Sequence, residues 1–232
     1  MNKKILDTAI VIPAYNEDTV IGNTIKDALT FFNTVVIVND NSSDKTAEEA
    51  INTGAIVLSH TIGLGQGGGI QTGIEYALED PGITYFATMD ADGQHRAKDI
   101  INMRKQLIKN NDDIVIGSRF IDGGTANGIS PFKKIFLKVA VIFSNITSGT
   151  KFTDTHNGIR IFNRHVAETI NIEESGYQHA SEILEKIVKH GYKCSECPVE
   201  IRYTKYSVSK GQSWLNAVNI GADVIGRKII RK

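Results

Sequence analysis

Apolar and polar positions alternate in two different rhythms along the first half of the chain. Short apolar runs rich in β-branched residues are typical of strands buried on both faces. The stretches between them, where apolar residues recur every three or four positions, predict amphipathic helices. We expect strands at residues 9–13, 35–38, 55–58, 83–88 and 114–116, and helices at about residues 18–32, 46–52, 74–78 and 98–109. This order predicts an α/β fold with a mainly parallel, Rossmann-like sheet and helices on both faces.

The second half of the chain has a looser pattern, which begins after residue 120. Residues 123–128 are rich in glycine and predict a mobile loop. We expect a helix over residues 131–147, a short strand over 158–162, a helix over 181–190 and a strand near Val199. No linker separates autonomous units, so residues 1–232 predict a single domain.

The C-terminal segment, residues 211–232, predicts an amphipathic helix with a basic end. Its apolar positions fall on one helical face, and its basic residues gather near the terminus. The apolar face comprises Trp214, Val218, Gly221, Ile225 and Ile229, and the basic end comprises Arg227, Lys228, Arg231 and Lys232. Such a helix can lie on an anionic membrane surface, pack on the protein's own core, or pair with another subunit. All three remain open.

The charge balance argues against nucleic-acid binding. Lys and Arg number 26, as do Asp and Glu, so the formal net charge is zero, whereas nucleic-acid binding needs a basic surplus. Charged residues near the start of the chain interrupt any leader-like apolar core, and no apolar run reaches the ~20 residues of a spanning helix. We therefore expect a cytoplasmic protein, either free or peripheral on the inner face of the cytoplasmic membrane.

Two cysteines, Cys194 and Cys197, stand in a Cys-x-x-Cys spacing. A zinc site would need two further ligands, and no partner pair is visible nearby. A redox pair usually opens a helix, whereas residues 198–201 have the pattern of a strand. We interpret both as plain reduced thiols.

The stretch from Met89 to His95 carries the main chemical signal, because it directly follows the predicted strand 83–88. Asp90 and Asp92, one residue apart, would point to the same side at the carboxyl edge of the sheet, where open α/β folds bind ligands. Two such carboxylates repel each other unless a cation lies between them. With the amide oxygen of Gln94 they suit Mg²⁺ or Mn²⁺, which in turn suits a diphosphate. The alternative is an acidic turn without a ligand.

Polar clusters also follow the first two predicted strands. Residues 13–17 close the first strand and Asp40 closes the second, so both would meet Asp90 at one edge. There Glu17 or Asp40 could accept hydrogen bonds from a base or ribose, and Tyr15 could pack against a base. The glycines of residues 63–69 have a dinucleotide-like spacing but follow the third strand. They favour a close backbone approach to a ligand, or a lid, over a nicotinamide site.

The motifs together, in their order along residues 8–212, resemble those of family 2 glycosyltransferases. The similarity is greatest to the branch of dolichyl-phosphate mannose synthases and other polyprenyl-phosphate glycosyltransferases. A match of several motifs in order is far more specific than any single one. The motifs lie at residues 11–17, 38–44, 63–69, 90–95, 117–120, 153–160 and 198–210.

This resemblance implies a GT-A fold and transfer of a sugar, with inversion, from a nucleotide-diphosphate donor. Residues 1–120 would bind the donor and residues 121–210 the acceptor. The donor residues would be Pro13, Ala14, Tyr15, Glu17, Asp40, Gly63, Gly65, Asp90 and Ala91. Mg²⁺ or Mn²⁺ would be held by Asp90, Asp92 and Gln94, and the catalytic residues would be Asp92, Arg119, Asp154 and Arg160. The two arginines would grip phosphate oxygens.

The chain departs from the pattern of this family at several positions. Asn39 replaces an acidic residue, and Leu64 and Gln66 stand where many relatives have a lysine nearby. Asn157 and Ile159 replace the small residue and the Phe of the later segment. These changes bear on the donor contact of the glycine segment and on the acceptor phosphate.

The acceptor divides the remaining hypotheses. A polyprenyl phosphate is already an anion and needs no general base, whereas a sugar hydroxyl on a lipid-linked or cell-wall glycan does. Asp154 or Glu182 would be that base, with His95, His156 and His179 as further candidates. Uridine donors are favoured over guanosine donors. A non-catalytic subunit that binds nucleotide sugars and a nucleotidyltransferase are the other classes, and a homo-oligomer or a membrane-protein partner stays open.

Overall fold

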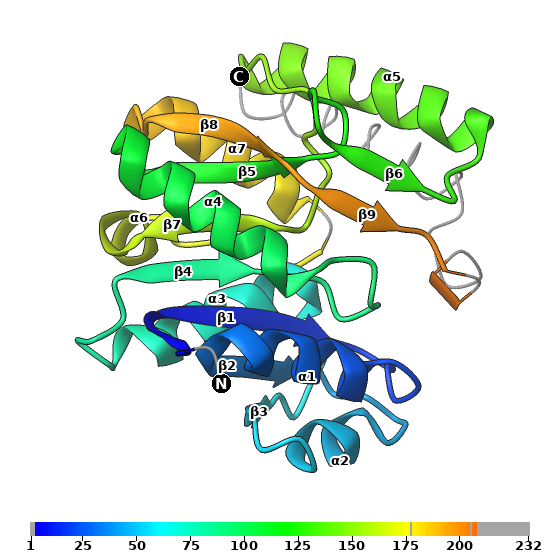
Figure 1. Cartoon of the computed structure of the whole chain (residues 1–232), viewed down its shortest axis with the longest axis vertical. Coiled ribbons are helices and arrows are strands. Elements are labelled where there is room, and N and C mark those ends of the chain that lie inside the picture. Colours follow the sequence, from blue (N-terminus) through cyan, green and yellow to red (C-terminus); the bar gives the residue numbers. More distant parts are fainter. Residues whose placement is uncertain (1–2, 177, 205, 208–232) are drawn as a thin grey trace.

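A seven-stranded sheet forms the centre of the protein, in the strand order β3-β2-β1-β4-β7-β5-β8 (Figure 1). The computed structural model describes residues 3–176, 178–204, 206 and 207, so the predicted helix 211–232 lies outside the described residues. β7 runs antiparallel to β4 and β5, and the other pairs are parallel. The strands are β1 (Ile5–Ala14), β2 (Phe32–Asn39), β3 (Ile56–Ser59), β4 (Tyr85–Thr88), β5 (Ile114–Ser118), β7 (Arg160–Asn163) and β8 (Cys194–Pro198).

Helices cover both faces of this sheet, as the alternation of patterns predicts. One core cluster packs α1 (Ile21–Phe31), α2 (Thr46–Ile51) and α4 (Ala97–Asn110) against one face. A second cluster packs α3 (Gly65–Leu78), α6 (Arg164–Thr169) and α7 (His179–His190) against the other. Most residues of β1, β2 and β5 are buried, which explains why the sequences of these parallel strands are rich in continuous apolar residues.

The long helix α5 (Pro131–Ser148) lies outside the central sheet, at the top of the view in Figure 1. Its ends carry strong sequence signals. The Ser130 side chain accepts a hydrogen bond from the Lys133 N–H, Pro131 occupies the first helical turn, and Gly149 ends the helix with φ +74°. The predicted range of 131–147 is therefore confirmed to within one residue.

The glycine-rich segments were predicted least well. Residues 125–127, expected in a mobile loop, form β6 (Thr125–Asn127), which pairs in parallel with β9 (Glu200–Arg202). The segment 65–69, expected as a loop before a helix, is the start of α3 itself. A side chain on Gly73 would overlap Val11, and one on Gly69 would come within 3.0 Å of Pro13. The glycines therefore let α3 approach β1 closely, which a pattern of apolar residues does not reveal.

Candidate active site at the carboxyl edge of the sheet

Asp90 lies just beyond the end of β4, where the chain leaves the sheet. One carboxylate oxygen accepts a hydrogen bond from the Gln66 side chain at 2.8 Å, and the other pairs with His95 Nε2 at 3.1 Å. About a third of the Asp90 side chain, 32%, remains exposed. The carboxylate is thus oriented by two neighbours while one side stays open to a ligand.

Gly158, which precedes β7, is the floor beneath this carboxylate. A Cβ placed on Gly158 would overlap both oxygens and the Cγ of Asp90. The Thr88 hydroxyl donates to the carbonyl of Gly158 at 2.7 Å, which fixes this segment against the end of β4. Only glycine leaves room for Asp90 in its observed position.

Asp92 follows two residues later and turns back on its own loop. It accepts a 3.0 Å hydrogen bond from the Gln94 N–H and a second one from the Gln94 side-chain amide. Burial raises the pKa of Asp92, and the neighbouring Asp90 charge raises it further. Desolvation alone would also raise the pKa of Asp90, but the His95 hydrogen bond and the charges of His95 and Arg160 outweigh it, so this pKa lies below its ordinary value.

This acidic pair suits a divalent cation that also holds substrate phosphates. Mg²⁺ is usually bound by one or two carboxylates, with waters and phosphate oxygens as its other ligands. Within the described residues, no group of three or more His, Cys, Asp or Glu could hold a metal alone. Asp90 and Asp92 would therefore supply the protein ligands, and the adjacent Gln94 amide is tied to Asp92 in this arrangement.

The loops after β1 and β2 interlock beside this pair. Ser43 N–H donates to the Asn16 side chain at 2.8 Å, and Glu17 N–H donates to Thr46 Oγ1 at 2.7 Å. Pro13 and Ala14 are buried at the end of β1, whereas Tyr15 is exposed. Glu17 accepts a 2.8 Å hydrogen bond from the Tyr206 hydroxyl. The predicted nucleoside residues thus share one edge, with Tyr15 facing outward.

Asp40 has a different environment from the one predicted. It accepts hydrogen bonds from the Leu64 and Gly65 N–H groups at 2.7 Å each, and its first oxygen also lies 2.7 Å from His60 Nδ1. A Cβ placed on Gly63 would lie 3.8 Å from an Asp40 carboxylate oxygen, so the backbone of Gly63 runs close to this side chain. In this arrangement Asp40 fastens the start of α3, because an anion is favourable beside unpaired N–H groups at a helix N-terminus.

Arg119 and Asp154 were predicted as catalytic residues, but they are bound to each other. Arg119 Nε lies 2.6 Å from one Asp154 oxygen and Nη2 lies 3.2 Å from the other, while Arg119 Nη1 donates to the Tyr203 hydroxyl at 2.6 Å. Both side chains are buried, and Asp154 is only 1% exposed. The geometry therefore shows a buried ion pair between these two side chains.

Arg160 is the opposite case, a buried cation whose charge is not fully matched. It is 2% exposed, and its Nε and Nη1 atoms have no hydrogen-bond partner among the described residues. Burial lowers its pKa, and the nearby charges of Asp90 and Asp154 oppose that change. Burial and the Arg160 charge lower the pKa of the neighbouring His179 to about 4, so this histidine is neutral at pH 7. Unpaired buried donors beside Asp90 suit an anion or an ordered water.

Lys133, on the first turn of α5, adds a second positive charge near the pair. Its Nζ lies 4.7 Å from the centre of the Tyr203 ring. Partial burial and the Arg119 charge lower its pKa, whereas the charge of Asp92 raises it. The acidic edge and α5 therefore meet around Tyr203.

Glu182, a predicted candidate base, is also bound by its surroundings. Its two oxygens accept hydrogen bonds from the Glu173 and Glu174 N–H groups at 2.9 Å, and Lys186 lies 2.8 Å away. Its role is to shape the 173–175 segment, which in turn packs on α3. Gly67 N–H donates to the Ser175 carbonyl at 2.8 Å.

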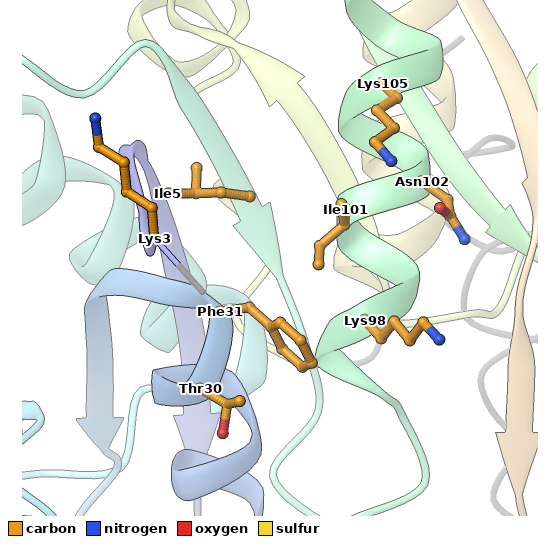
Figure 2. Close-up of a pocket in the computed structure, with 8 residues that line it drawn as sticks. All are labelled: Lys3, Ile5, Thr30, Phe31, Lys98, Ile101, Asn102 and Lys105. Carbon is orange, nitrogen blue, oxygen red and sulfur yellow. The ribbon is translucent and has the colours of Figure 1, made fainter. Parts of the chain in front are cut away.

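A hollow of about 490 Å³ lies elsewhere, between α1 and α4 (Figure 2). The residues that line it include none of those predicted for the site. In Figure 2, Phe31 at the end of α1 and Ile101 on α4 point toward each other, and Lys98 and Lys105 extend from α4. The lining residues are Lys3, Ile5, Thr30, Phe31, Lys98, Ile101, Asn102 and Lys105.

The sequence did not single out several residues that complete the site. Gln66 and Gly158 orient Asp90, and Tyr203 and Lys133 join the acidic edge to α5. Gln66, Gly158 and Tyr203 lie in the motifs at residues 63–69, 153–160 and 198–210, but a place in a motif does not show which side chain each one reaches. Lys133 lies outside all of the motifs.

The fold and site together define the class. The acidic pair lies at the carboxyl edge of an open α/β sheet, where such folds bind their ligands. Residues 9–170 match the model for Glycosyl transferase family 2, and the chain belongs to this family. It is a glycosyltransferase with a GT-A fold.

Relatives and solved structures agree with this assignment. The protein named Uncharacterized protein MJ1222 of Methanocaldococcus jannaschii is 34% identical, over 95% of this chain and 91% of its own length. The UDP-N-acetylglucosamine–dolichyl-phosphate N-acetylglucosaminyltransferase of Methanococcus voltae is 27% identical, over 96% of this chain and 95% of its own. Glucosyl-3-phosphoglycerate synthase from Mycobacterium tuberculosis, crystallised with Mn²⁺ and UDP, shares the fold with a TM-score of 0.71, at 14% identity over 97% of this chain and 79% of its own.

Proposed function

We propose that this glycosyltransferase moves a sugar from a uridine-diphosphate donor to a polyprenyl phosphate, with inversion at the anomeric carbon. Residues 1–120 bind the donor and residues 121–210 receive the acceptor. The Methanococcus voltae relative is named for transfer from a UDP-sugar to dolichyl phosphate, which supports both the donor and the acceptor. The polyprenol monophosphomannose synthase of Mycolicibacterium smegmatis, 26% identical over 88% of this chain, is named for a polyprenol product and supports the acceptor.

The observation that carries the choice of acceptor is the state of the candidate bases. Asp154 is paired with Arg119, and Glu182 is held by Lys186 and two backbone N–H groups. A sugar hydroxyl needs a base to take its proton, whereas a phosphate oxygen attacks as an anion. Because the Asp154 and Glu182 carboxylates are already bound by basic side chains or backbone N–H groups, a phosphate acceptor is favoured.

In the proposed reaction, an oxygen of the lipid phosphate forms a bond to the anomeric carbon while the bond from that carbon to the donor diphosphate breaks. The nucleoside diphosphate leaves with the electron pair. Asp90 and Asp92 would hold Mg²⁺ or Mn²⁺, and the ion would supply positive charge to the leaving diphosphate. Arg160 and Lys133 supply positive charge where the two phosphate groups approach each other.

Release of UDP from a panel of UDP-sugars, with and without a short polyprenyl phosphate, tests the proposal. We expect release that needs the lipid phosphate, Mg²⁺ or Mn²⁺, and Asp92, and that is abolished in Asp92→Asn but kept in Asp122→Asn, a change at an exposed loop residue. Release that proceeds equally well without lipid phosphate would contradict the proposed acceptor. No release from any UDP-sugar, with GDP released from GDP-sugars instead, would contradict the proposed donor.

A further inference from the structure

An aliphatic stripe runs along the outer face of α5. Its members are the four residues Ile135, Val139, Ile142 and Ile146, which are 65%, 59%, 59% and 77% exposed. At about 100° per residue they fall within an arc of about 60° on the helix. Single exposed aliphatic residues are common on protein surfaces, but a continuous row on one helix marks an interaction surface.

The opposite face of α5 is the one that packs on the protein. Val141, Ser144 and Ser148 are buried there, and α5 contacts α7. The helix is therefore amphipathic in an unusual sense, since its inner face includes serines while its outer face is aliphatic. The inner face of α5 packs on the rest of the protein, whereas the outer stripe is exposed.

Charge next to the stripe indicates the kind of partner. Lys134 and Lys138 are exposed along one flank, and residues 131–148 contain no Asp or Glu. Within the described part of the chain, neither lysine forms an ion pair. An aliphatic face bordered by lysines complements a bilayer surface that carries anionic lipids, into which such a helix sinks by one face.

We infer that α5 docks this protein on an anionic membrane surface through the aliphatic stripe, with Lys134 and Lys138 against the lipid headgroups. A second copy whose α5 paired antiparallel with this one would bring the lysine flanks of both helices together, so charge complementarity favours an anionic lipid surface. None of the helices in the described part of the chain has the length and apolar character of a membrane span. The inference goes beyond the proposed function and does not need a lipid acceptor. It would, however, bring the bilayer to Lys133 at the edge of the site.

Co-sedimentation of the full chain with vesicles tests this inference without any sugar donor. One set of vesicles contains neutral phosphatidylcholine, and the other adds anionic phosphatidylglycerol. We expect binding to the anionic vesicles that falls at least about a hundredfold in Ile142→Glu/Ile146→Glu and about thirtyfold in Lys134→Gln/Lys138→Gln. The matched control, Ile51→Glu/Ile108→Glu, changes two exposed aliphatic residues on α2 and α4 and leaves binding unchanged.

Three outcomes would overturn the inference. The stripe variant could bind vesicles as the unmodified chain does, or the unmodified chain could fail to bind. Light scattering could also show a dimer that becomes a monomer in the stripe variant without any vesicle binding, which would assign the stripe to a second copy. If the unmodified chain binds the anionic vesicles but releases no UDP from any UDP-sugar, the result would count against the proposed function alone.

Discussion

The loops after β4 and β5 lie at the same edge of the sheet, but their charged residues have different surroundings: the β4 loop carries Asp90 and Asp92, whereas the β5 loop carries Arg119, which meets Asp154 from the segment before β7. Beyond β4, Asp90 is held by the Gln66 amide and by His95, and 32% of its side chain stays exposed. Beyond β5, the Arg119 guanidinium closes on Asp154, which is buried. A carboxylate with a permanent internal counter-charge stabilises the fold, whereas one without it is available to a cation.

The same comparison separates the two arginines. The Arg119 guanidinium donates hydrogen bonds to Asp154 and Tyr203. The Nε and Nη1 atoms of Arg160, by contrast, are buried and have no hydrogen-bond partner among the described residues. The site is therefore concentrated around β4 and β7. The Arg119–Asp154 ion pair joins the loop after β5 to the segment that precedes β7.

Replacing Asp92 tests the acidic pair after β4 and should have the largest effect on activity. We expect Asp92→Asn to lower the rate of UDP release by about a thousandfold or more, because one of the two charged ligands for the cation is lost. Steady-state release assays measure this, with Asp122→Asn as the control. A loss below tenfold, at saturating metal, would contradict the role of Asp92.

Breaking the Arg119–Asp154 ion pair should instead destabilise the fold. Asp154→Asn leaves the buried Arg119 charge without its counter-charge, so we expect the free energy of unfolding to fall by about 3 kcal/mol. Urea denaturation measures the change, and metal-dependent UDP binding should persist in the folded variant. A variant as stable as the parent but inactive would show that Asp154 acts as a base.

Adding a single methyl group tests the floor beneath Asp90. Gly158→Ala would push the Asp90 carboxylate out of position, and we expect about a hundredfold loss of UDP release with a retained fold. Gly22→Ala is the matched control, since a Cβ there meets only Glu49 Oε2 at 4.0 Å. Full activity in Gly158→Ala would mean that Asp90 does not need its observed position.

The smallest expected effect concerns Gln66. Gln66→Met removes the 2.8 Å hydrogen bond to Asp90 while keeping a long side chain, so we expect about a tenfold weaker affinity for Mn²⁺ in the presence of UDP. Mn²⁺ titration of UDP release reports this affinity. An unchanged metal requirement would show that His95 alone orients Asp90.

The parts of this comparison that depend on local patterns could be predicted from the sequence. The β-branched runs located the strands of the first half, and the spacing of Asp90 and Asp92 after β4 located the acidic pair. The Arg119–Asp154 pair joins residues 35 positions apart, and the hydrogen bonds of Asp40 span 24 and 25 positions. Such contacts depend on how loops meet in space. A sequence pattern shows that a carboxylate is present but not which donor reaches it.

The position of β7 was beyond prediction for a related reason. The sequence predicts a short strand over residues 158–162, but nothing local indicates that it runs antiparallel between β4 and β5. That insertion places Gly158 under Asp90 and Arg160 beside it. The floor of the site therefore depends on the order of strands in the sheet.

Calorimetric titration of UDP into the protein, with and without Mn²⁺, tests most directly whether the end of β4 holds a cation and a diphosphate together. We expect Mn²⁺ to tighten UDP binding at least about tenfold in the unmodified chain and in Asp122→Asn, and to leave it unchanged in Asp92→Asn. Equal UDP affinity with and without Mn²⁺ in the unmodified chain would contradict this account.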